Sequence, residues 1–577
     1  MLIPVQEGII ANSCKKSSLT ILLAAILLTM ILSTSAYYFH WPELVIPLKG
    51  KVVQLSSLSL SLSPSPSKIG ENITIFGNCT NQQGKPCPYQ QVLIEFSLDR
   101  AIWTGLGLTE TNQDGCYSID WMPSFDGLCW IRCTSENTSA TLQHVTADSI
   151  VTNVSQLLTA TSAGGVVFVK RGIYDLNPHL LYPYTQIVLT SNTSVIGESM
   201  DETIIRMFPN RQNIGSNVRE TVVLIRGGSR SISLQNLTFL QNGTPDNLGG
   251  KTIDFEDGSE QKEKTSGISI TRLRIADCFG AGMAIRNAEN VLVAECIIER
   301  AWTGLIVSNS SHVRVENSSF MKCSGDGIYV PVTSRHVSIE RNQLQYVNDT
   351  AIDLACDRNL SPNENITIRN NFVQSGNHLR ISNTINSSII CNQLKFTNIL
   401  VDAGQSRSVN IVVADNLILS NASFGIAFLG AKDCTVRNNS IVMMKPEFES
   451  LATQSGIIAA IFGAALIENN TVINATDYGI SFGGYGLGSG SNLTIIGNYL
   501  LSFGKIGIWD DGRKQGGAVL IQDNTIWDQS NPFNSIYGIK TDYINNKFSI
   551  IRNRIFAGAI LAVSAPNSIV LNNDYKL

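Results

Sequence analysis

The sequence predicts an all-β protein in which a long parallel β-helix follows a small β-sandwich and a membrane-spanning N-terminal segment. Three observations predict it: a Gly-apolar unit that recurs about every two dozen residues, Asn at a second phase with steps of 21 to 31 residues, and one uncharged apolar run near the N-terminus. The chain has 577 residues, a formal net charge of −4 and 15% charged residues. So few charges exclude a coiled coil, and the lack of a Lys/Arg block argues against a nucleic-acid partner.

The N-terminal run from Leu19 to Phe39 is uncharged and long enough to cross about 30 Å of hydrocarbon. Lys15 and Lys16 precede it and no basic cluster follows it. The positive-inside rule therefore places residues 1–18 in the cytoplasm and the bulk of the chain outside. A cleaved signal peptide ending near Ala36 is the alternative. Both interpretations predict export, as a single-pass protein of the cell membrane or as a secreted one.

Sequons and cysteines agree with export. Asn-x-Ser/Thr sequons recur from Asn72 to Asn492, which predicts a glycoprotein where the cell has the required machinery. Five of the 12 Cys lie between Cys79 and Cys133, a density typical of disulfide-linked segments of exported proteins. The odd count leaves one of these thiols unassigned.

Residues 40–67 are predicted to be a linker, because the stretch 56–66 is rich in Ser, Leu and Pro. Residues 68–151 predict a β-sandwich, because turn signals separate four short alternating runs, at 72–76, 92–96, 116–121 and 128–132. The motif Thr111-Asn-Gln-Asp-Gly-Cys-Tyr117, followed by Trp121-x-Pro123, resembles Ig-like domains of bacterial and archaeal surface proteins. That resemblance implies a spacer or a binding module without catalytic residues.

Residues 157–577 form the repeat array. Its Gly-apolar unit recurs from Gly282-Met-Ala-Ile to Gly538-Ile-Lys. Its second phase is marked by Asn317, Asn342, Asn371, Asn392, Asn416, Asn439, Asn470, Asn498, Asn524 and Asn553. Repeats rich in Val, Ile and Asn, without a helical period, predict a parallel β-helix. We expect Asn to stack coil on coil through its amide, and Gly to lie where the chain bends tightly into the next strand.

The array opens with the motif Val167-Phe-Val-x-x-Gly172-x-Tyr174. Together with the Asn and Gly phases, this motif resembles the right-handed parallel β-helix of the pectin-lyase superfamily, over more than 400 residues. Such a solenoid offers a long face that suits an extended polysaccharide or a cell-surface glycan as its partner.

Ionisable residues gather near the Gly-apolar strand of a few central coils, whereas most coils carry small or neutral residues there. Equivalent positions of stacked coils lie ~4.8 Å apart, so we expect these side chains to be neighbours on one face. The candidate catalytic residues are Asp326, Asp349, Asp353 and His378. The candidate substrate-binding residues are Asp357, Arg380, Lys395 and Asp402.

Paired carboxyl groups suit glycoside hydrolysis, in which one protonates the leaving oxygen and another activates water or attacks the anomeric carbon. Arg380 offers a bidentate fork for a uronate carboxylate. The spacing of these residues along successive coils resembles that of polygalacturonase-type glycoside hydrolases. Their motifs are Asn-Thr-Asp, Gly-Asp-Asp and Gly-His-Gly, and the resemblance matches Asp326 to the first, Asp349 to the second and His378 to the third. The sequence departs from these motifs: Ser324-Gly325 replaces Asn-Thr, Asn348 replaces an Asp, and His378 lacks both flanking glycines.

Two other functions fit the same residues. A uronate lyase or epimerase would use His378 or Arg380 as its base, with calcium as a possible acid-neutralising ion on Asp349, Asp353 and Asp357. A non-catalytic adhesin or cell-envelope protein would bind glycans with the same fold. The acidic groups at 254–257 and 509–513 are expected to be solvated loops, with a sugar-stacking platform at Trp509 as the alternative.

Overall fold

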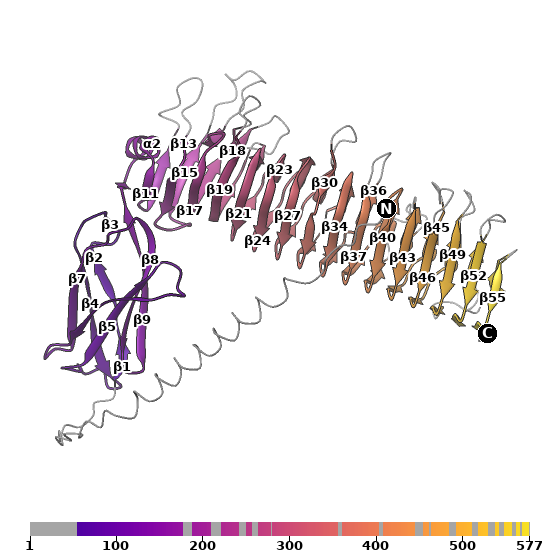
Figure 1. The fold of residues 1–577 in the computed structure, drawn as a ribbon, viewed down its shortest axis with the longest axis horizontal. Helices are drawn as coiled ribbons and strands as arrows, with labels where there is room; N and C mark the ends of the chain where they lie inside the picture. Colours follow the sequence, from indigo (N-terminus) through magenta and orange to yellow (C-terminus); the bar gives the residue numbers. More distant parts are fainter. Residues whose placement is uncertain are drawn as a thin grey trace, which may run out of the picture.

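The computed structural model comprises a small two-sheet unit and a long stack of strands (Figure 1). It describes residues 55–575 except 177–186, 209–220, 242–249, 257–262, 279, 356–360, 375, 403–407, 445–453, 461–462, 484–491, 511–516, 529–536, 542–546, 557–560 and 566–567. The predicted cytoplasmic N-terminus, the span at 19–39 and residues 40–54 of the predicted linker lie outside the described residues. Residues 55–67, which are also predicted as linker, belong instead to the small two-sheet unit. Within the described ranges, no helix has the length and apolar character needed to cross a membrane.

Residues 55–147 fold into two small sheets that share one core, in which Ile73, Ile94 and Ile131 are fully buried. The first sheet contains β1 (Leu55–Leu58), β2 (Ser61–Ser63), β4 (Ile73–Asn81) and β7 (Cys116–Trp121). The second contains β3 (Ser67–Lys68), β5 (Gln91–Ser97), β6 (Thr104–Glu110), β8 (Gly127–Ser135) and β9 (Thr138–Ala147). All four strands predicted in this part are present, and the two sheets form a β-sandwich. Its Ig-like character stays a prediction.

The five clustered cysteines of the sandwich are free thiols. Four of them are buried in the shared core, and Cys116 is exposed. Burial is the main cause that raises the pKa of Cys79 to about 11, and it raises the pKa of Cys129 to about 12, so both stay protonated at neutral pH. The predicted disulfide is therefore not formed among these five residues, because four of the side chains serve as small apolar core residues.

The sandwich continues directly into the solenoid. β10 (Ser149–Val151) pairs in parallel with β11 (Gly165–Val169), and Val145 of the sandwich shares a small core with Phe168. Between these strands lies α2 (Val154–Ala163), which the sequence analysis does not predict. Its Leu157 is fully buried in the solenoid core, so the helix covers the N-terminal end of that core (Figure 1).

The solenoid stacks parallel strands coil on coil, which confirms the predicted β-helix (Figure 1). Each typical coil gives one strand to a 15-stranded sheet and two to a 32-stranded sheet, as β20 (Ala281–Arg286), β21 (Ala288–Ala294) and β22 (Ile297–Glu299) do. The 15-stranded sheet consists of β13 (Ile187–Leu189), β16 (Thr221–Ile225), β18 (Lys251–Phe255), β20 (Ala281–Arg286), β23 (Thr303–Ser308), β26 (Ile328–Val332), β29 (Thr350–Ala355), β33 (His378–Ser382), β36 (Ile399–Asp402), β39 (Phe424–Leu429), β42 (Ser455–Ala460), β45 (Tyr478–Phe482), β48 (Ile506–Asp510), β51 (Tyr537–Thr541) and β54 (Leu561–Ser564).

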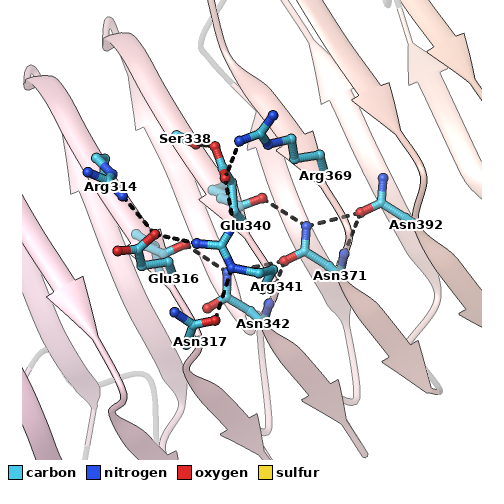
Figure 2. A network of polar contacts seen from close by, with 12 residues as sticks. Arg314, Glu316, Asn317, Ser338, Glu340, Arg341, Asn342, Arg369, Asn371 and Asn392 are labelled. Atoms are coloured by element: carbon cyan, nitrogen blue, oxygen red, sulfur yellow. Dashed lines mark hydrogen bonds and ion pairs between the residues drawn. The ribbon is translucent and has the colours of Figure 1, made fainter.

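A ladder of buried asparagines joins successive coils at one corner. The backbone N–H and the side-chain amide of Asn342 both donate to Oδ1 of Asn371, at 2.9 and 3.1 Å, and Asn371 does the same to Asn392 (Figure 2). The ladder continues through Asn416, Asn439, Asn470, Asn498, Asn524, Asn553 and Asn573. The predicted Asn phase is confirmed with one correction. Asn317 precedes the ladder position, at a φ of 51°, and Ser318 occupies it instead.

The Gly phase marks where neighbouring coils approach closely. A Cβ on Gly304 would lie 2.5 Å from the carbonyl oxygen of Gly327, and a Cβ on Gly327 would lie 2.5 Å from that of Ala351. The next coil therefore leaves no room for a side chain at these positions, which is a reason for glycine beyond the predicted tight bend.

Charged residues on the outer face of the 32-stranded sheet pair with one another across coils. Arg341 donates to Glu316 at 2.7 Å and to Glu340 at 3.2 Å, and Arg369 donates to Glu340 at 2.7 Å (Figure 2). Exposed pairs of this kind contribute little to stability. They leave the opposite charges on this face balanced.

Candidate functional site

The register of the 15-stranded sheet decides which residues form the site. Ile352 pairs with Ile328 and Leu379, and all three are fully buried in the core. Because successive strand residues point to opposite faces, the next residue in each strand points outward. This outward row contains, in order, Asp254, Ala284, Ile306, Tyr329, Asp353 and Arg380.

Three of the predicted catalytic residues line one cavity. Asp326, Asp349 and Asp353 open onto a space of about 350 Å³, together with Lys251, Trp302 and Tyr329; we call this group of six the acidic cleft. Asp326 and Asp349 lie in the turns that lead into β26 and β29. The backbone N–H of Thr350 donates to Asp326 Oδ1 at 3.3 Å, which ties the first turn to the next coil.

The carboxyl groups of the acidic cleft perturb one another. Burial raises the pKa of Asp353 to about 7; Arg380 opposes this rise, and the negative charges of Asp326 and Asp349 add to it. Burial, followed by the charge of Asp349, raises the pKa of Asp326 to about 6. Asp353 is only 7% exposed, and its Oδ1 has no hydrogen-bond partner among the described residues. Asp353 is therefore a buried acid that keeps its proton well above the pH at which an ordinary aspartic acid loses it.

Arg380 lies beside Asp353 on the next strand, β33, and Nη2 of Arg380 donates to Asp402 Oδ2 at 3.3 Å. His378 is on the same strand. Its Nδ1 lies 2.6 Å from Oδ1 of Asn398, and its ring stacks on Phe424 at 6.0 Å. Both partners belong to later coils, so the imidazole is held on the C-terminal side of the cleft, and its catalytic role stays a prediction.

Two predicted residues are not brought to this group. Lys395 lies on β35 (Gln393–Lys395), which belongs to the 32-stranded sheet, and its ammonium group lies 5.2 Å from the ring of Phe396. Its expected place beside the cluster is therefore incorrect, because the chain reaches the next strand of the 15-stranded sheet only at Ile399. Asp357 lies outside the described residues.

The acidic group at 254–257 is also corrected in its described part. Asp254 lies on β18 and is 5% exposed; its Oδ2 accepts from Arg286 Nη2 at 2.6 Å and lies 3.4 Å from Lys251 Nζ. A solvated loop was expected there. The sequence signal for this placement is the alternation Ile253-Asp254-Phe255, which matches Ile352-Asp353-Leu354.

Sequence reasoning missed Trp302, Tyr329 and Lys251. Trp302 precedes β23, and Lys251 begins β18, which is two coils before β23. Tyr329 shares the outward row with Asp353. A count of outward positions in the Gly-apolar strands would have found Tyr329. Among the described residues, no group of three or more His, Cys, Asp and Glu side chains is arranged to hold a metal ion. Calcium stays a prediction.

The described fold and site define a parallel β-helix with an acidic cleft on one sheet. In agreement, the family model described as the right-handed β-helix region matches residues 213–394, a range that contains the three carboxyl groups of the cleft. No curated protein matches the sequence significantly.

Several solved structures are similar in general architecture. The catalytic unit of a GH87 α-1,3-glucanase from Streptomyces thermodiastaticus is 11% identical, with a TM-score of 0.33, over 91% of this chain and 97% of that chain. The family 28 exopolygalacturonase of Yersinia enterocolitica is 9% identical, with a TM-score of 0.30, over 91% and 97%. The A-module of a mannuronan C-5 epimerase from Azotobacter vinelandii is 14% identical, with a TM-score of 0.26, over 73% and 100%. Similarities of this size carry no information about activity.

Proposed function

We propose that the acidic cleft hydrolyses a glycosidic bond in an extended, uronate-containing polysaccharide. The observation that carries this proposal is the buried carboxyl group of Asp353, whose pKa is raised to about 7 beside two further carboxyl groups in one cavity. A glycoside hydrolase needs an acid that is still protonated at its working pH and a second carboxylate within the same site.

The three carboxyl groups take different roles. Asp353 gives its proton to the leaving glycosidic oxygen as the bond to the anomeric carbon breaks. Asp349, which is exposed, accepts a proton from the water that adds to that carbon. Asp326 acts as a positioning residue, because its charge adds to the rise in the pKa of Asp353. Arg380 binds the carboxylate of a neighbouring uronate unit.

The protein should release new reducing ends from polygalacturonate or alginate, and its activity should fall as pH rises through about 7, where Asp353 loses its proton. The measurement is a reducing-end assay over a pH series, with a neutral glucan beside the two polyuronates. Ultraviolet absorbance from an unsaturated product would show that the reaction is that of a lyase instead of a hydrolase. Changed uronate stereochemistry without cleavage would show that it is an epimerisation. No reaction on any substrate would leave the non-catalytic adhesin as the function.

The cleft is expected to work outside the cell. The apolar run at 19–39 would hold the chain at the membrane, and the sandwich, with its resemblance to Ig-like surface domains, would act as a spacer. The small core that Val145 of the sandwich shares with Phe168 of the solenoid supports this role, since it packs the two units against each other. Protease added to intact cells should remove the solenoid and leave a membrane-bound remnant. Protection of the whole chain until the cells are lysed would exclude this location.

A further inference from the structure

A second group of side chains lies on the same sheet as the acidic cleft, several coils toward the C-terminus. The outward row that contains Asp353 and Arg380 continues through Leu400, Ala427, Ile458, Ser481, Trp509 and Lys540. Trp509 is thus six strands beyond Asp353, a distance of roughly 29 Å at the ~4.8 Å spacing of paired strands. Two cations of this row, Arg380 and Lys540, flank the stretch that leads to Trp509, and the four residues between Arg380 and Trp509 are uncharged.

Aromatic rings gather at the far end of this row. Tyr478 and Trp509 stack with ring centroids 4.2 Å apart and an interplanar angle of 24°. The ammonium group of Lys540 lies 5.3 Å from the ring of Tyr537 on the same strand. Ile480 and Ile508, the inward neighbours on β45 and β48, are fully buried, so Trp509 points away from the core and is half-buried. We call Tyr478, Trp509, Tyr537 and Lys540 the aromatic platform.

We propose that the aromatic platform is a remote binding site for the same anionic polysaccharide that the acidic cleft cleaves. Aromatic faces pack against the C–H faces of sugar rings while the hydroxyl groups stay in water. Lys540 adds a positive charge that suits a uronate carboxylate, as Arg380 does beside the acidic cleft. Between Arg380 and Trp509, Leu400 and Ile458 are half-buried, and Ala427 and Ser481 are small and buried, so no charge in the row itself opposes an anionic chain that follows it. The identity of the polymer, but not the presence of the platform, rests on the proposed function.

The test measures binding separately from cleavage. Trp509→Ala and Tyr478→Ala are made in the intact protein and in an Asp353→Asn background, and affinity electrophoresis compares polygalacturonate with a neutral glucan. Each platform variant is expected to weaken polygalacturonate binding about tenfold, with cleavage of a trisaccharide unchanged. Trp509→Phe, which keeps an aromatic face, should recover most of the binding. The matched control is Trp527→Ala, which removes a 40% exposed tryptophan from the 32-stranded sheet and should have no effect.

The outcomes separate the two proposals. Unchanged polymer binding in folded Trp509→Ala and Tyr478→Ala proteins would overturn the platform, whether or not the cleft is active. Weakened binding without cleavage of any substrate would support the platform and overturn the hydrolase. Equal loss of binding in Trp527→Ala, or equal binding of the neutral glucan, would overturn the assignment of an anionic chain to this face.

Discussion

Asp353→Asn is expected to lower the rate of polysaccharide cleavage by at least about a hundredfold, since a positioned general acid contributes roughly 10²–10⁴. The amide has the shape of the carboxyl group but has no acidic proton to give to the leaving oxygen. The measurement is kcat for the polyuronate that the wild-type protein cleaves. Substrate binding should persist, because Arg380 and the aromatic platform remain.

The same variant should report on folding through its pH dependence. A carboxyl group whose pKa rises on folding binds its proton more tightly in the native state, so its contribution to stability is lost as pH rises from about 4 toward 7. Asp353→Asn removes that loss. The melting temperature of the variant relative to the wild type should therefore increase across this pH range.

Two further variants complete the test of Asp353. Asp326→Asn should move the fall in activity to lower pH, because the pKa of Asp353 drops when a neighbouring negative charge is removed. Asp415→Asn is the matched control, because Asp415 is exposed at a φ of 57°, where Asn is equally suited, next to the 32-stranded sheet. Wild-type activity in Asp353→Asn, or equal losses in Asp415→Asn, would remove Asp353 from the mechanism.

Asn439→Ala is expected to lower the free energy of unfolding by about 3 kcal/mol, because a buried donor left without an acceptor costs about 1–3 kcal/mol. Asn439 is 1% exposed. Its Oδ1 accepts from the backbone N–H and the side-chain amide of Asn416, at 3.0 and 2.9 Å. Its own amide donates to the carbonyl oxygens of Val413 and Arg437, at 2.9 and 3.0 Å. The substitution leaves groups of two coils unsatisfied at once.

Chemical denaturation measures the loss, and hydrogen exchange should show it first in the coils on either side of Asn439, since each coil of a solenoid contacts only its neighbours. Asn492→Ala is the matched control. Asn492 is exposed on β46 (Asn492–Ile496), and its register partners on the adjoining strands are Ala464 and Ala518. Equal stability losses in the two variants would mean that the corner ladder is dispensable.

The parallel β-helix was predictable because its two signals repeat at fixed phases. The Asn phase gave the ladder from Asn342 onward. It failed only at Asn317, where Asn suits a left-handed turn position and the hydroxyl of Ser318 serves in the ladder. The helix α2 was not predictable in the same way, because it occurs once and is rich in Ser and Thr, which are weak helix formers.

The part of the site that follows from the alternation of inward and outward residues within one strand could be predicted. Asp353 and Arg380 occupy the same outward row because each follows a buried residue of the core. The position of Lys395 was predicted wrongly because the coils differ in length. Counting a fixed number of residues from one coil to the next therefore leads to a strand of the 32-stranded sheet instead of the 15-stranded sheet. Trp302 was missed because its proximity to the carboxyl groups depends on the conformation of the turn before β23. Burial of the cysteines likewise follows from packing that spacing alone does not encode.

The Asn corner also fixes how distances along this molecule can change. Each coil forms the same hydrogen bonds with the next coil, so whole coils can be added or removed as units of length. Insertion or loss of one coil between β33 and β48 would shift Trp509 relative to Asp353 by one strand spacing, ~4.8 Å, and leave both sets of side chains unaltered. The length of polymer held between the acidic cleft and the aromatic platform is thus set by the number of coils between them. Relatives of this chain can adjust it without changing any residue that touches sugar.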